Sequence, residues 1–71
     1  MPAELLKTCI AARAAGRDFR TIYETIIRPH PLRLGSLRSA TDGQRIWLDV
    51  ALSTGERLVY ESAQDVFRLD R

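Results

Sequence analysis

A short proline-containing segment, Pro29-His30-Pro31, separates two parts of this sequence that differ in hydrophobic period. Before it, apolar residues recur every three or four positions, as on one side of an α-helix. After it, apolar and polar residues alternate, as in a strand that is buried on one face. Because a proline disfavours the helical conformation of the residue before it, Pro29 is expected to end the helical part near Arg28. The segment itself is expected to form a stiff, extended connector.

The helical part is predicted to contain two amphipathic helices, at residues 2–15 and 18–28. Pro2 suits the first helical turn, and Gly16 supplies the left-handed residue that closes a helix. Asp18 can accept hydrogen bonds from the free N–H groups at the start of the second helix. The apolar residues expected to face the core are Leu5, Leu6, Cys9, Ile10 and Ala12 in the first helix, and Phe19, Ile22, Ile26 and Ile27 in the second.

The remaining chain is predicted to form three antiparallel strands, at residues 32–39, 44–52 and 56–61, with residues 66–69 as a candidate fourth strand. Consecutive short strands with turn signals between them are typical of a β-meander. The expected fold class is therefore α+β, with both helices packed on one face of the meander.

The register of the second predicted hairpin follows from its turn. Leu58 and Tyr60 must share a face with Leu48 and Val50 to enter the same core, and only a loop with an odd number of residues allows this. A three-residue loop ending at Gly55 pairs Leu48 with Tyr60 and gives the glycine the left-handed position that such loops require.

The first predicted hairpin has two alternative registers. A two-residue turn that includes Gly43 pairs Leu37 with Leu48, whereas a three-residue loop ending at Gly43 pairs Leu34 with Val50. A bulge at the glycine after Leu34 is a third arrangement, which would turn both leucines inward. The sequence leaves these alternatives open.

Length limits how stable such a chain can be. With 71 residues, it is expected to form one domain, residues 1–71, whose core supplies no more than about 3–5 kcal/mol of net stability. Its single cysteine, Cys9, is expected to be a buried, inert thiol, and its single histidine, His30, a surface residue. They are too few for an internal disulfide or a structural zinc site. Association with a protein partner or a second copy is the remaining source of stability.

Several functional classes lack support in the sequence. No nucleophile motif and no glycine-rich phosphate loop is present, so no catalytic activity and no cofactor is predicted. No segment has the length and composition of a signal peptide or a membrane span, so a cytoplasmic protein without membrane contact is expected.

The leading functional hypothesis is a non-catalytic binding or assembly module that acts through protein–protein association, including as a homodimer. Alternation places Trp47 on the sheet face opposite the helices, with Val59, Arg45 and Arg57 on the same side. Tryptophan and arginine are enriched at interface hot spots, so this face and a free sheet edge are the candidate protein-binding surfaces.

The alternative hypothesis is a nucleic-acid-binding protein. Residues 1–38 have a net charge of +4 and residues 39–71 a net charge of −2. The spacing of small and apolar residues from Ala12 to Ile22 partly matches a helix-turn-helix unit. The candidate contacts to phosphates or bases are Arg17, Arg20, Tyr23 and Arg28.

Overall fold

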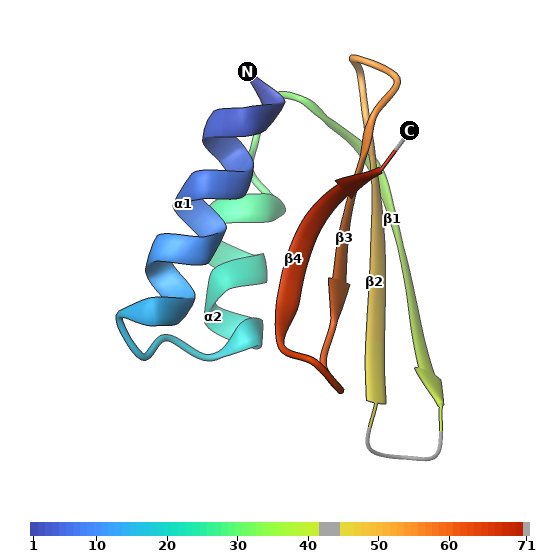
Figure 1. Cartoon of the computed structure of the whole chain (residues 1–71). Helices are drawn as coiled ribbons and strands as arrows, with labels where there is room; N and C mark the ends of the chain where they lie inside the picture. The colour runs from blue at the N-terminus through green and yellow to red at the C-terminus, as the bar shows by residue number, and fades with distance from the viewer. Residues whose placement is uncertain (42–44, 71) are drawn as a thin grey trace.

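The computed structural model describes the backbone of residues 1–41 and 45–70 and the side chains of residues 1–37 and 48–70. It has the predicted α+β class: a four-stranded antiparallel sheet carries a helical layer on one face (Figure 1). The candidate fourth strand is therefore present. The elements in chain order are α1 (Pro2–Ala14), α2 (Phe19–Ile22), η1 (Tyr23–Ile27), β1 (Arg33–Thr41), β2 (Arg45–Leu52), β3 (Arg57–Glu61) and β4 (Val66–Asp70).

Helix α1 ends as its sequence predicts. Gly16 has a φ of +91°, and its N–H donates to the Arg13 carbonyl, while Arg17 N–H donates to the Ala12 carbonyl. These two bonds form a Schellman motif, which satisfies carbonyls that a helix end leaves open. One residue of the predicted apolar stripe was misassigned, because the side chain of Ile10 is 48% exposed.

The second predicted helix is not a regular α-helix. The Asp18 side chain caps it as expected, accepting a hydrogen bond from Thr21 N at 2.8 Å, but only α2 is α-helical. In η1 the backbone widens to a π-helix, in which Arg28 N donates to the Tyr23 carbonyl. Two features favour the wider turn: Pro29 cannot donate to the carbonyl four residues before it, and the Thr25 hydroxyl bonds the Thr21 carbonyl at 2.7 Å.

The connector is folded into turns rather than extended. His30 N donates to the Ile27 carbonyl, and Arg33 N donates to the His30 carbonyl. In the second of these turns Pro31 occupies the position after the first residue, where its fixed φ is favoured. The prolines therefore redirect the chain sharply from the helical layer into β1.

The strands follow the order β1-β2-β3-β4, and the predicted register of the second hairpin is confirmed. Leu48 pairs with Tyr60 and Val50 with Leu58, and Gly55 has a φ of +91°. The chain thus passes through a three-residue loop, as turn chemistry and alternation together predicted.

Neither predicted register of the first hairpin is correct. Leu37 pairs with Asp49 and Ser36 with Val50, and the register shifts between Arg33 and Gly35. The turn residues 42–44 lie outside the described residues. The bulge also does not turn the leucines inward, because Leu34 and Leu37 are 71% and 68% exposed. The core-side position of β1 is instead taken by Ser36, whose hydroxyl accepts a hydrogen bond from Tyr23 Oη.

The core lies between the helical layer and the inner face of β2, β3 and β4. The predicted buried face of Leu48, Val50, Leu58 and Tyr60 is confirmed, since each of these side chains is at most 4% exposed. The other members of the core cluster are Leu5, Cys9, Ile22, Ile27, Leu52 and Phe67.

The turn glycine gives a matched stability test. Gly55→Ala should lower the free energy of unfolding by about 1–2 kcal/mol, because a Cβ disfavours the left-handed conformation. Space is not the cause, since an added Cβ at Gly55 meets no atom within 4 Å. Gly35 is equally open but lacks a positive φ, so Gly35→Ala should be neutral or stabilise by up to about 1 kcal/mol. Urea unfolding of both variants checks the prediction, and equal effects would contradict it.

Candidate functional site

The two outer strands of the sheet differ in length and protection. β4 has five residues and packs beside α1, whereas β1 has nine, and only β2 pairs with it in the described part of the chain. Leu34 and Leu37 of β1 expose most of their side chains. We call the unpaired side of Arg33–Thr41 the β1 edge. A long edge of this kind is a template for pairing with another strand.

The hydrogen-bond pattern shows which backbone groups the β1 edge presents. Leu52 N donates to the Glu56 carbonyl at 3.0 Å. Since bonding direction alternates along a strand, even-numbered residues of β2 bond to β3 and odd-numbered residues bond to β1. Asp49 is odd-numbered and pairs with Leu37, so Leu37 directs its N–H and C=O toward β2. The residues on either side of it, including Ser36, direct theirs outward.

A pocket of about 450 Å³ opens next to this edge, between the second helical segment and the inner face of β1 and β2. Its lining combines two aromatic rings and one leucine with a basic, an acidic and a hydroxyl side chain. The lining residues are Phe19, Arg20, Tyr23, Glu24, Ser36 and Leu48.

Positive charge dominates the side of the pocket that meets β1. The Ser36 hydroxyl accepts hydrogen bonds from Tyr23 Oη and from Arg33 Nη1, both at 3.2 Å. Arg33 Nε donates to the Arg28 carbonyl at 3.0 Å, which holds the guanidinium in place. Among the residues that the structure describes, Arg20 makes no ion pair.

The candidate nucleic-acid contacts are only partly brought together. Arg20 and Tyr23 meet in the pocket, whereas Arg28 forms an ion pair with Glu24 at 3.0 Å. The side chain of Arg17 is exposed and does not line the pocket. Because the second helical segment is one short α-helix continued by π-turns, the regular second helix of the predicted helix-turn-helix unit is not formed.

Of the candidate protein-binding residues on the opposite face, Val59 and Arg57 have described side chains, and only Val59 differs from expectation. Val59 is 1% exposed, so it is not part of the accessible surface, and Arg57 forms an ion pair with Asp49 at 3.3 Å. Trp47 and Arg45 are described only as backbone, and this prediction about their side chains lies outside the described residues.

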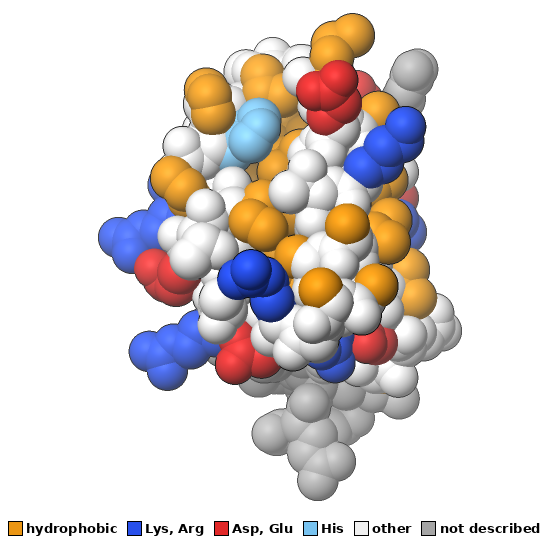
Figure 2. Space-filling model, turned by 90° about the vertical axis from the view of Figure 1, so that its left-hand side faces the viewer, with side chains coloured by type: hydrophobic (Ala, Val, Ile, Leu, Met, Phe, Trp, Pro, Cys, Tyr) orange, Lys and Arg blue, Asp and Glu red, His pale blue; other side chains and the backbone are white. Residues whose placement is uncertain are grey.

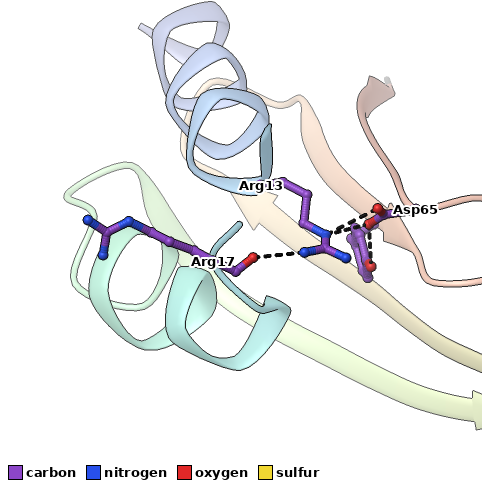
Figure 3. Close-up of polar contacts among 4 residues, drawn as sticks. Arg13, Arg17 and Asp65 are labelled. Atoms are coloured by element: carbon purple, nitrogen blue, oxygen red, sulfur yellow. Dashed lines mark hydrogen bonds and ion pairs between the residues drawn. The ribbon is translucent and has the colours of Figure 1, made fainter. Parts of the chain in front are cut away.

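A second polar cluster joins α1 to the turn between β3 and β4 (Figure 3). Arg13 Nε contacts both carboxylate oxygens of Asp65, at 2.9 and 3.1 Å, and Arg13 Nη1 donates to the Arg17 carbonyl at 3.0 Å. Tyr60 Oη donates to Asp65 Oδ1 at 2.9 Å. Asp65 occupies a left-handed conformation with a φ of +56°, which an aspartate tolerates better than most residues.

The perturbed pKa values of Asp65, Asp18, Tyr60 and Cys9 are explained by hydrogen bonds within the fold or by burial. Hydrogen bonds from Arg13 and Tyr60 lower the pKa of Asp65, and hydrogen bonds from Thr21 lower that of Asp18. Burial is the main cause that raises the pKa of Tyr60. Burial also raises the pKa of Cys9 to about 11, so the thiol stays protonated near neutral pH, and its predicted burial is confirmed.

The outer face of the helical layer carries hydrophobic side chains interspersed with polar ones (Figure 2). Met1 and Ile10 are the large hydrophobic residues of α1 and its N-terminus that are exposed. A groove of about 390 Å³ lies next to Ile10, but Arg13 and Asp65, the two charged side chains that line it, are bonded to each other. This groove therefore offers a ligand little polar recognition.

The described residues contain neither a metal-binding cluster nor a membrane-spanning helix. They contain no cluster of three or more side chains able to hold a metal ion, and His30 Nδ1 instead accepts a hydrogen bond from Leu32 N at 3.2 Å. None of the helices in the described residues is long and apolar enough to span a membrane.

Comparisons with protein-family models, curated proteins and solved structures gave no match. The site must therefore be argued from geometry. The sequence predicted a free sheet edge as a candidate surface, but it did not indicate which strand forms that edge. It did not predict the pocket. The signal that could have located the edge is the three-residue spacing of Leu34 and Leu37, which prevents both from facing the core of a regular strand.

The lowered pKa of Asp65 predicts how stability depends on pH. Asp65→Asn should reduce the free energy of unfolding near neutral pH, because the native state favours the ionised carboxylate. This contribution is present above the ordinary aspartate pKa of 3.8 and is lost as the pH falls through the folded value. The gap between wild type and Asp65→Asn should therefore close on acidification.

Urea unfolding at a series of pH values measures this gap. Asparagine keeps a residue that tolerates the left-handed conformation, and the lowered pKa of Asp18 cancels because both proteins contain it. Arg13→Gln and the double variant complete a mutant cycle, which isolates the Arg13–Asp65 coupling. A gap that is independent of pH contradicts the prediction.

Proposed function

We propose that this chain is a non-catalytic protein-association module that binds an extended segment of a partner by adding it as a strand to the β1 edge. The observation that carries the proposal is the length of this edge, nine residues, with outward-facing backbone groups and two exposed leucines. Main-chain hydrogen bonds supply affinity in strand addition, and alternate side chains supply specificity.

The positive charge of β1 indicates which kind of segment would bind to it. Arg33–Thr41 contains two arginines and no acidic residue. Pairing with β1 of a second copy brings four arginines into one ladder, and like charges close together on paired strands are unfavourable. An extended segment that carries acidic side chains is complementary to the same strand. The occupant proposed is therefore an acidic segment of another protein.

The titratable groups support a non-catalytic role. The shifted groups with a polar partner are Arg13, Asp18, Tyr60 and Asp65. The causes of their shifts belong to a helix cap or to the cluster between α1 and the β3–β4 turn. Cys9 is fully buried, so its thiol is out of reach of a substrate. Asp65 also lines the groove beside Ile10, where its carboxylate is bonded to Arg13.

Strand addition can be tested with a defined peptide, acetyl-TVTETVT-amide, titrated into the isotope-labelled chain. Backbone amide signals of residues 36 and 38 should shift and gain protection from hydrogen exchange, because these N–H groups point outward. A synthetic chain with an N-methylated Ser36 amide removes one outward donor. It should keep the wild-type unfolding midpoint and lose most of its affinity for the peptide.

Two results overturn this proposal. Either shifts confined to residues outside β1, or unchanged affinity after N-methylation of Ser36, would show that the edge does not bind the peptide. Sedimentation over a range of concentrations tests the other occupant. A dimer that N-methylation dissociates would mean that a second copy, and not an acidic segment, takes the β1 edge.

A further inference from the structure

We infer that the pocket beside Ser36 is a specificity site that receives a glutamate side chain from the strand added to the β1 edge. The inference rests on the proposed strand addition and names the chemistry that the partner must carry. It follows from where the pocket lies relative to the edge, from the charges at its mouth and from the apolar surface inside it.

Register geometry brings one partner side chain to the pocket. Residues directly opposite each other on neighbouring strands direct their side chains to the same face of a sheet. Ser36 pairs with Val50, which is fully buried under the helical layer, so Ser36 lies on the helix side. The partner residue opposite Ser36 must therefore also direct its side chain to that side, where Ser36 lines the pocket.

The charges at this position fit a carboxylate. Arg20 lines the pocket and makes no ion pair within the described residues, and Arg33 reaches the Ser36 hydroxyl with Nη1 at 3.2 Å. Glu24, the acidic side chain among the described residues of the lining, already forms an ion pair with Arg28 at 3.0 Å. The pocket thus keeps a net positive charge that a partner carboxylate can neutralise.

The interior of the pocket favours a long acidic side chain over a short one. Phe19, Tyr23 and Leu48 contribute apolar surface to the lining of the pocket. Glutamate has one more methylene than aspartate to place against this surface, and burying a methylene group favours binding. Lysine offers similar methylenes but would place its charge beside Arg20.

The test uses the host peptide acetyl-TVTXTVT-amide with X as Glu, Gln or Lys, labelled for fluorescence anisotropy. Wild-type protein should bind the Glu peptide at least about fivefold more tightly than the Lys peptide, the ratio expected of one partly exposed ion pair. Arg20→Glu should reverse this order. Arg17→Glu makes the same charge change at an exposed position outside the pocket and should retain the Glu preference.

The outcomes separate this inference from the proposed function. If the peptides bind with equal affinity and N-methylation of Ser36 still abolishes binding, strand addition stands and the pocket assignment is wrong. If Arg20→Glu and Arg17→Glu weaken Glu binding equally, the effect is that of net charge and the assignment is also wrong. If no peptide binds, both proposals are overturned. Unchanged unfolding midpoints show that the variants are folded.

Discussion

The stacked contact between Phe19 and Tyr60 fixes the position of the helical layer on the sheet. The two rings are nearly parallel, and their centroids are 4.6 Å apart. The ring centroid of Phe67, a residue of β4, lies 4.5 Å from that of Tyr60. The hydroxyl of Tyr60 continues the link to Asp65, and through Asp65 to Arg13 of α1. One side chain of β3 therefore holds together the aromatic core, the last turn of the sheet and the end of the first helix.

This anchoring has a consequence at the other end of the sheet. In the described part of the chain the extensive helix–sheet contact is that of α1 with β4, and β1 makes no comparable contact with a helix. A large apolar side chain on the inner face of β1 would therefore meet little of the core. The inner position of β1 is accordingly a serine, which Tyr23 reaches by a hydrogen bond. The space that remains between Tyr23 and the strand is the pocket. The pocket and the unprotected edge thus have the same physical origin.

How far the sequence predicts the structure depends on whether two independent signals agree. Around Gly55 the loop chemistry and the alternation of apolar residues demand one register, and that register forms. In β1 each of the alternative registers turned at least one leucine inward. Leu37 instead pairs with Asp49, and the register shift between Arg33 and Gly35 interrupts the alternation at Leu34. The π-turns of η1 could not be predicted from the spacing of apolar residues. That spacing indicates which side of a helix is buried, but not which carbonyl accepts the hydrogen bond of each backbone N–H. The pocket could not be predicted, because its shape depends both on the register of β1 and on the π-turns of η1.

The two uncovered surfaces of the sheet differ in what a partner gains by covering them. On the face opposite the helices, Val59 is already buried, and next to it Asp49 and Arg57 form an ion pair at 3.3 Å. A partner there must desolvate charged groups. Leu37, which pairs with Asp49 on this same face, is the exposed apolar side chain that it would cover. At the β1 edge, a partner strand pairs backbone groups that only water can otherwise satisfy and covers exposed leucine surface. The unpaired backbone groups of the edge therefore support the proposed strand addition.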